Sequence, residues 1–217
     1  MWDIFFTALL WQEGKYILLV LLAIAVAGYW WYKPLLYLAI VLLVFTIFFF
    51  RNPIRICSAA LKNNAVIVCP ADGKVVDVQI SRTGELEGYA QKVSIYLSPF
   101  DVHVNWIPYT GTVKDVIYKS GTFSLAFLPK SSALNERNDI IIQGDNAATI
   151  KVRQIAGTIA RRICCWVKPV SRVNAGQKFG MIRFGSRVDI FLPANVRLEV
   201  GVGQRVYGGQ TVLGVFI

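Results

Sequence analysis

The sequence predicts a mainly β domain that follows an N-terminal pair of apolar membrane helices, and three observations carry this prediction. Hydrophobic residues make up 55% of the 217 residues, charged residues 17%, and the mean hydropathy is +0.49, so the chain is more apolar than most soluble domains. Residues 16–50 contain one strongly polar side chain. Residues 55–217 instead hold short alternating runs with turn signals between them and no long helical period. We therefore expect a membrane anchor over residues 1–54 and a β-rich domain over 55–217.

The apolar stretch is too long for one straight membrane helix. As a single helix, residues 16–50 would extend about 52 Å at roughly 1.5 Å per residue, whereas the hydrocarbon core of a bilayer is roughly 30 Å thick. Lys33-Pro34 supplies a break, because proline lacks a backbone donor and disfavours helix in the residue before it. Two short helices over about 16–32 and 35–50 follow, and they either cross the membrane twice or enter it as a hairpin.

The distribution of charge predicts how this anchor is oriented. Lys15 precedes the apolar stretch, and Arg51 and Arg55 follow it. This pattern satisfies the positive-inside tendency and places both ends, with the β-rich domain, on the cytoplasmic side of the cell membrane. Residues 1–50 contain two acidic and two basic residues, so the net charge of +10 belongs entirely to the rest of the chain. We expect this basic domain to contact an anionic membrane surface. Nucleic acid is not the expected partner, since Lys and Arg are scattered rather than clustered with aromatic residues.

Ten runs with β-type composition divide the second domain, with a short helix expected near residues 131–135. Dipeptides typical of turns, such as Asp72-Gly73, separate these runs. Two segments, 70–76 and 201–212, resemble each other and the strand-and-turn units of biotinyl and lipoyl carrier domains, so we expect two such sheet units. The second segment has no lysine that could carry a prosthetic group, which excludes a carrier function. The predicted strands are 65–69, 73–80, 92–97, 111–118, 139–142, 148–156, 159–167, 180–184, 188–192 and 196–202.

The cysteines and the single histidine do not form a recognisable metal site. Cys57, Cys69, Cys164 and Cys165 include no CxxC pair, and His103 is distant from all of them in the sequence. Zinc is therefore not expected. Adjacent cysteines seldom bond to each other, so the pattern indicates small buried side chains in a reducing compartment rather than a disulfide framework.

Three further positions could carry chemistry, although each also has an ordinary structural interpretation. A lone histidine such as His103 is more often structural than catalytic. Asp72 lies in a Pro-Ala-Asp-Gly turn, where aspartate commonly bonds its own backbone. Gly185-Ser186 lies between two strand-like runs and is typical of a turn, but Gly-Ser is also a junction at which some chains cut themselves. Taken alone, none of the three decides the function.

Taken together and in order, these motifs resemble those of the phosphatidylserine decarboxylases, specifically the short bacterial and archaeal type. The resemblance extends over essentially the whole chain, and the shared order and spacing make it specific. The motifs that carry it are FFRNP at 49–53, PADG at 70–73, SPFDVHVN at 98–105, NER at 135–137, QIAG at 154–157, ARRI at 160–163 and FGSRVD at 184–189.

The resemblance implies a membrane-associated enzyme that makes its own covalent cofactor. Ser186 would attack the Gly185 carbonyl, with His103 as the base and Asp72 orienting it in the manner of a serine-protease triad. This autocatalytic serinolysis would yield a large chain, 1–185, and a small chain that begins with a pyruvoyl group made from Ser186. The pyruvoyl group would form a Schiff base with phosphatidylserine, and loss of CO2 would give phosphatidylethanolamine, with His103 as the candidate proton donor. Neither a metal nor pyridoxal phosphate is implied.

One position departs from the family pattern. Longer members of the family have a second histidine three positions after the first, and this chain has Trp106 there. Either His103 serves both self-cleavage and decarboxylation, or one of the two steps relies on water or another group. The alternative to an enzyme is a membrane-tethered β-domain that binds lipid or protein, and this alternative predicts an uncut chain. The sequence leaves open a homo-oligomer and the lipid backbone of the substrate.

Overall fold

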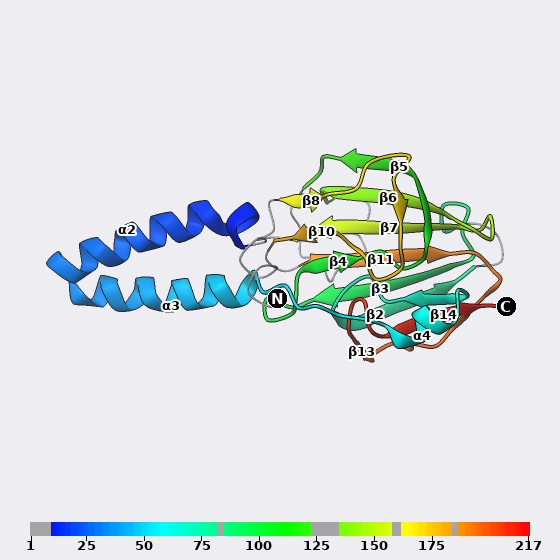
Figure 1. The fold of residues 1–217 in the computed structure, drawn as a ribbon, viewed down its shortest axis with the longest axis horizontal. Helices are drawn as coiled ribbons and strands as arrows, with labels where there is room; N and C mark the ends of the chain where they lie inside the picture. The colour runs from blue at the N-terminus through cyan, green and yellow to red at the C-terminus, as the bar shows by residue number, and fades with distance from the viewer. Residues whose placement is uncertain (1–9, 82–84, 123–134, 158–161, 184–185) are drawn as a thin grey trace. The chain divides into compact units, whose positions relative to one another are not determined.

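A computed structural model describes residues 10–81, 85–122, 135–157, 162–183 and 186–217. The chain divides into two compact units, residues 1–54 and 55–217 (Figure 1).

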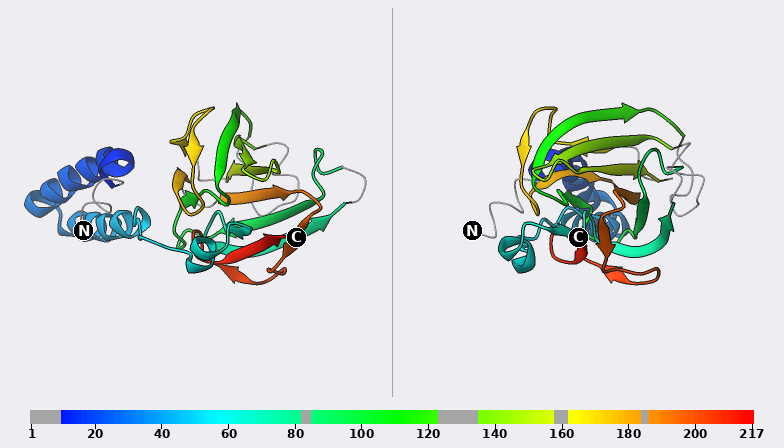
Figure 2. Two further views of the ribbon diagram at one scale, coloured as in Figure 1. Left: turned by 45° about the vertical axis from the view of Figure 1, so that its right-hand side comes forward. Right: turned by 90° about the vertical axis from the view of Figure 1, so that its right-hand side faces the viewer.

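The first unit consists of two apolar helices that pack side by side (Figures 1 and 2). A π-helical turn, η1 (Leu10–Gly14), leads into α2 (Lys15–Trp31), and α3 (Lys33–Phe49) follows after a single residue. That residue, Tyr32, has an extended backbone with φ −154° and ψ 98°, and Pro34 occupies the first turn of α3, where its missing N–H costs no hydrogen bond. The first helix thus ends at Trp31 and the second begins at Lys33, next to the Lys33-Pro34 pair where the sequence predicts a break.

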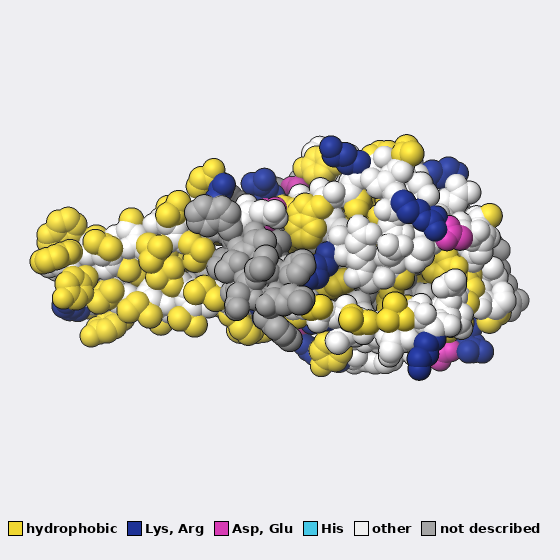
Figure 3. All heavy atoms as spheres, in the orientation of Figure 1, with side chains coloured by type: hydrophobic (Ala, Val, Ile, Leu, Met, Phe, Trp, Pro, Cys, Tyr) yellow, Lys and Arg dark blue, Asp and Glu magenta, His cyan; other side chains and the backbone are white. Residues whose placement is uncertain are grey.

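Apolar side chains cover most of the outer surface of this unit, as Figure 3 shows for one face. Among the described helices, the continuous stretch Gln12–Trp31 is long and apolar enough to cross a membrane, whereas Lys33–Phe49 is apolar but shorter, with 17 residues. An apolar N-terminal helix is thus present, and two membrane crossings stay a prediction.

In its described residues, the second unit is built from antiparallel strands in three sheets, with one short helix, α4 (Ser58–Lys62), before the first strand. The large sheet has eight strands in the order β13-β2-β3-β11-β7-β6-β5-β9 and is strongly curved (Figure 2). Two three-stranded sheets have the orders β4-β10-β8 and β1-β14-β12. The strands are β1 (Val66–Val68), β2 (Gly73–Ile80), β3 (Gln91–Leu97), β4 (Val104–Trp106), β5 (Gly111–Lys119), β6 (Arg137–Gly144), β7 (Thr149–Ala156), β8 (Ile163–Cys165), β9 (Arg172–Val173), β10 (Lys178–Ile182), β11 (Ser186–Leu192), β12 (Val196–Leu198), β13 (Arg205–Val206) and β14 (Val212–Phe216).

The hydrophobic core lies on one face of the large sheet and includes residues from all three sheets. In β11, Val188 and Ile190 belong to this core, so by strand alternation the side chain of Ser186 points to the same face. Arg187 and Asp189 alternate with them and point to the opposite face, where they form a buried ion pair. The first residue of β11 is therefore directed toward the smaller sheets.

The prediction of a mainly β domain is confirmed, although the short strands were not all predicted. The expected strand 73–80 matches β2 at both ends, while β4, β9, β13 and β14 have no predicted counterpart. The expected helix near 131–135 falls largely outside the described residues. The two mutually similar segments are neighbours, because β13 pairs with β2. Their likeness to biotinyl and lipoyl half-domains stays a prediction.

Candidate active site

Ser186 begins β11 in the middle of the large sheet. It pairs with Leu97 of β3 on one side and with Ala156 of β7 on the other. The residue is fully buried, and its Oγ has no hydrogen-bond partner among the described residues. Leaving a buried hydroxyl unpaired costs roughly 1–3 kcal/mol, so such a group calls for an explanation, and a nucleophile held ready for reaction supplies one. Gly185, the other half of the predicted cleavage site, lies outside the described residues.

His103 immediately precedes β4 and is fully buried. Its carbonyl oxygen accepts a hydrogen bond from the Ile182 amide at 3.2 Å, at the end of β10. Since β10 ends four residues before Ser186, this bond joins the backbone of His103 to the end of the strand that precedes β11. Its Nδ1 lies 2.9 Å from the carbonyl oxygen of Asp101. A carbonyl can only accept, so this contact assigns the proton to Nδ1 and leaves the lone pair of the neutral imidazole on Nε2.

The loop from Ser98 to His103 is held by the Asp101 side chain, which is 2% exposed. One carboxylate oxygen accepts hydrogen bonds from the Ser98 amide at 2.8 Å and the Ser98 hydroxyl at 2.7 Å. The other oxygen is paired with Arg205 of β13. Ser98 follows Leu97, the strand partner of Ser186, so the loop runs from the end of β3, beside Ser186, to His103. Sequence reasoning did not single out Asp101, although a Ser-x-x-Asp turn is a detectable signal.

Asp72 lies at the same end of the unit. The backbone before it is tied to β4, because the Trp106 amide donates to the Pro70 carbonyl at 2.9 Å. Both carboxylate oxygens of Asp72 accept from the Arg55 guanidinium, the second at 2.8 Å. One of them also accepts from the Gly208 amide at 2.9 Å. In the described part of the chain, the hydrogen bonds to Asp72 come from these two residues and not from the His103 ring, so its orienting role stays a prediction.

Trp106, at the position where the resemblance leads us to expect a second histidine in longer members of the family, is fully buried. The Arg55 guanidinium lies 4.9 Å from the centre of its ring, a cation–π contact. Gly208 and Gly209 pack on the indole so closely that a Cβ on either residue would overlap it. Burial, with the nearby Arg55 charge, lowers the pKa of Lys178, the strand partner of Trp106. At that position the chain therefore has an indole with the Arg55 guanidinium beside it, and neither group can act as a base near neutral pH.

Cys69 is the sulfur group nearest to Asp72 along the chain. Burial raises the pKa of its thiol to about 12, and the thiol donates a hydrogen bond to the Ala71 carbonyl. A protonated thiol is a poor nucleophile, so burial makes Cys69 unreactive near neutral pH. None of the four cysteines is in a disulfide bond. Among the described residues, no group of three or more His, Cys, Asp or Glu side chains is placed to hold a metal ion.

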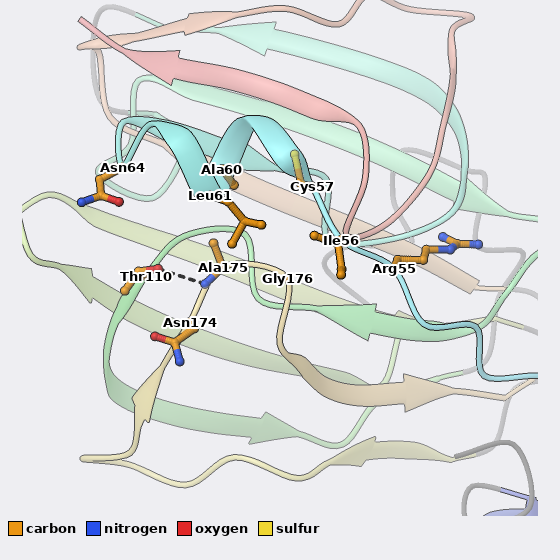
Figure 4. A pocket seen from close by; sticks show the side chains of 10 residues that line it. All are labelled: Arg55, Ile56, Cys57, Ala60, Leu61, Asn64, Thr110, Asn174, Ala175 and Gly176. Atoms are coloured by element: carbon orange, nitrogen blue, oxygen red, sulfur yellow. Dashed lines mark hydrogen bonds between the residues drawn. The ribbon is translucent and has the colours of Figure 1, made fainter. Parts of the chain in front are cut away.

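A cavity of about 490 Å³ lies between α4 and the segment around Asn174, and Figure 4 shows the side chains that line it. Arg55 stands at one end, with its guanidinium directed away from α4 (Figure 4). The opposite wall is fixed by a hydrogen bond from the Ala175 amide to the Thr110 hydroxyl at 3.0 Å. A second cavity of about 320 Å³ is lined by charged residues on the outer face of the large sheet, among them Arg153. Neither cavity is lined by Ser186 or His103, although Arg55, which pairs with Asp72, lines the first.

Comparisons with known proteins show the family to which the chain belongs. A family model described as phosphatidylserine decarboxylase matches residues 42–214. The chain belongs to the phosphatidylserine decarboxylase family. It is 45% identical over 174 residues to a phosphatidylserine decarboxylase proenzyme of Syntrophus aciditrophicus, a match that covers 80% of each chain. Proteins of the same name from Burkholderia vietnamiensis and Trichlorobacter lovleyi are 43% and 45% identical, over 79% and 80% of this chain and 79% and 78% of their own length.

The resemblance inferred from the motifs is thus confirmed, and with it the prediction of a decarboxylase enzyme. The structure brings Ser186, His103 and Asp72 to one end of the β unit. It also shows three contacts that the motifs alone did not identify. Arg55 pairs with Asp72, the Asp101 carbonyl contacts the His103 ring, and Arg205 pairs with the Asp101 carboxylate.

Proposed function

We propose that this chain is the precursor of a phosphatidylserine decarboxylase, which cuts itself between Gly185 and Ser186 and then converts phosphatidylserine to phosphatidylethanolamine and CO2. The observation that carries the proposal is the Ser186 hydroxyl, which is buried and unpaired among the described residues at the start of a central strand. Buried hydroxyls are normally satisfied, so its isolation favours a reactive role over a structural one.

In the proposed self-cleavage, Ser186 Oγ attacks the carbonyl carbon of Gly185 while its proton passes to the imidazole of His103. The peptide C–N bond breaks, the departing amine takes that proton, and Gly185 becomes an ester of the serine side chain. Removal of the Cα proton of residue 186 then breaks the Cβ–O bond, which leaves a carboxylate on Gly185 and dehydroalanine at 186. Tautomerisation and hydrolysis by water release ammonia and leave a keto group at the new terminus.

The assigned tautomer suits His103 to the first step. With the proton on Nδ1 donated to the Asp101 carbonyl, Nε2 carries the lone pair that accepts the serine proton. We assign Asp72 a supporting role, in which its ion pair with Arg55 and its bond to the Gly208 amide hold the 70–73 turn in place. That turn is tied to β4, the strand that follows His103, by the bond from the Trp106 amide to the Pro70 carbonyl, so Asp72 would help to position the histidine.

The position of residue 186 fits a pyruvoyl group. Simple hydrolysis would leave an ammonium group on a fully buried strand end, and burial of an unpaired charge is very costly. A pyruvoyl terminus is uncharged, so it suits this buried place. When formed, the group supplies a carbonyl that binds the amine of the substrate and withdraws electrons as CO2 leaves.

The two products of cleavage should stay together. The small chain, residues 186–217, contains β11, which pairs with β3 and β7, and β13 and β14, which pair with β2 and β1. The ion pair between Arg205 and Asp101 also joins the small chain to the large one. Extensive strand pairing therefore replaces the covalent link.

We further propose that the apolar N-terminal unit holds the enzyme at the cell membrane, with the β unit on the cytoplasmic side. The apolar surface of the helices and the basic flanks of the apolar stretch support this placement. The net charge of +10 favours contact with anionic lipids, among which the substrate is found.

A denaturing gel tests the self-cleavage. The wild-type chain should give two fragments, and Ser186→Ala should give one uncut chain without decarboxylase activity. His103→Ala should slow cleavage by about 10²–10⁴-fold, the usual contribution of a positioned acid–base group. Ser171→Ala, a serine in a turn, is the matched control and should cleave normally. Normal cleavage of Ser186→Ala would refute the proposal, and an uncut wild-type chain would favour a membrane-tethered binding domain.

A further inference from the structure

We propose that Lys74 and Arg205 form a binding site for the phosphodiester group of the phospholipid substrate. This inference rests on the proposed function and adds to it the residues that recognise the headgroup. It starts from the pairing of β2 with β13, in which Lys74 lies directly opposite Arg205. Residues opposite each other in an antiparallel pair have Cβ atoms about 4.5–5.5 Å apart and side chains on the same face.

Two cations in this relation repel each other unless an anion lies between them. Arg205 is paired with Asp101, yet its side chain is 58% exposed, whereas that of Asp101 is 2% exposed. Lys74 is exposed and has no hydrogen bond or ion pair in the part of the chain that the structure describes. The pair therefore presents more positive charge than its protein neighbours neutralise.

The positive charge lies beside the candidate active site. Lys74 is two residues from Asp72, and the carboxylate that holds Arg205 belongs to the residue whose carbonyl contacts His103. In the large sheet, β2 and β11 are separated by β3 alone, and Tyr96 of β3 pairs with both Lys74 and Arg187, so the backbone of Lys74 is about 10 Å from that of Arg187 at roughly 4.8 Å per strand. Lys74 alternates with the core residue Val75, so its side chain leaves the face of the sheet opposite to that of Ser186. A headgroup bound by Lys74 would therefore extend past the end of β3, which stops at Leu97 beside Ser186, to reach residue 186.

The chemistry of the two side chains fits a phosphodiester. A guanidinium offers five N–H donors in a planar fork, and in Arg205 one of them is used by Asp101. A lysine ammonium adds a compact positive charge with three donors. The phosphodiester of a phospholipid carries one negative charge on two free oxygens, which suits one fork and one ammonium. Binding there would leave the serine amine and carboxylate free to reach residue 186.

The exposed neighbour Tyr207 supports a lipid ligand rather than a small anion. It is 45% exposed, and its ring centre lies 5.9 Å from the guanidinium carbons of both Arg205 and Arg55. An exposed aromatic ring beside cations is typical of the boundary between a membrane and water.

The test compares Lys74→Gln and Arg205→Gln with two matched controls in the full-length, matured protein. Lys114→Gln removes an exposed strand lysine, and Arg197→Gln removes an exposed arginine that is paired with Glu199. Decarboxylation is measured in mixed micelles over a range of phosphatidylserine mole fractions. We expect Lys74→Gln to raise KM about tenfold, the effect of losing one charge-assisted hydrogen bond, with kcat and self-cleavage unchanged.

Arg205→Gln should raise KM at least as much, and Arg205→Lys should restore part of the loss because the charge returns without the fork. Both controls should keep the wild-type KM. A KM within twofold of wild type for Lys74→Gln and Arg205→Gln would overturn the site. A rise in KM with an equal fall in self-cleavage for Arg205→Gln alone would show a structural role for that residue and would likewise overturn it.

Two further arms separate the sources of the phosphate. Sedimentation with phosphatidylcholine vesicles, with and without phosphatidylglycerol, reports general attraction to anionic membranes. If Lys74→Gln and Arg205→Gln weaken only this sedimentation and leave KM unchanged, the substrate site is overturned. Binding of glycerophosphoserine, measured by calorimetry, reports the headgroup alone and should weaken about tenfold in Lys74→Gln. If wild-type protein binds it but releases no CO2, the proposed function fails and the site stands. If CO2 is released while Lys74→Gln binds as well as wild type, the site fails and the function stands.

Discussion

Replacing Arg55 by methionine should destabilise the β unit strongly, because it removes one partner of a buried ion pair. The side chains of Arg55 and Asp72 are 10% and 5% exposed. Without the guanidinium, the Asp72 carboxylate keeps the Gly208 amide but loses its counter-charge. Breaking a buried pair in this way costs about 3–5 kcal/mol. At roughly 2–4 °C per kcal/mol for a chain of this size, the unfolding midpoint should fall by about 10 °C.

The assay uses thermal unfolding in detergent, followed by circular dichroism, with every variant built on Ser186→Ala so that all molecules are uncut. Arg172→Met is the control, because its partner Asp145 is exposed and the midpoint should barely change. The double variant Arg55→Met with Asp72→Asn should recover much of the lost stability, since no uncompensated charge stays buried. With Ser186 restored, that double variant should still fail to cleave at the normal rate. If the unfolding midpoint of Arg55→Met were as high as that of Arg172→Met, the account of this ion pair would be refuted.

Three other predictions follow from particular contacts. Gly208→Ala should lower the unfolding midpoint because its Cβ would overlap the Trp106 ring, whereas Gly201→Ala, with open space around it, should not. Burial alone would raise the pKa of Glu87, but hydrogen bonds from two basic neighbours outweigh it and lower the pKa to about 2 from 4.5. Its contribution to stability is therefore complete above about pH 4.5 and is lost as the pH falls toward 2, and Glu87→Gln should flatten a titration of the unfolding midpoint in that range. The protein should sediment with membranes in high salt, while deletion of residues 1–50 should release a chain that still cleaves itself.

Most of the fold could be predicted because long elements carry a clear periodicity. The helix break followed from one proline, and β2 followed from eight residues bounded by a turn. The short strands could not be predicted in the same way. The three residues of β4 are all buried, so they show no alternation, and β9 and β13 are two residues long. Tertiary pairing, rather than local pattern, creates these elements.

The candidate site was predictable in its chemistry but not in its contacts. The order and spacing of the motifs, through their resemblance to the family, made Ser186, His103 and Asp72 the candidates. No local pattern indicates that Arg55 pairs with Asp72, or that Arg205 lies opposite Lys74. Both contacts join residues far apart in the chain and depend on how the sheets close.

The most direct test of the central claim is a mass spectrum of the purified protein after unfolding. The account predicts two species, residues 1–185 and residues 186–217, the second with a pyruvoyl group in place of its N-terminal serine. Reduction with cyanoborohydride in the presence of ammonia should convert that terminus to alanine, which the mass change would report. An intact chain of 24.3 kDa, or a small fragment with an unmodified serine terminus, would contradict the account.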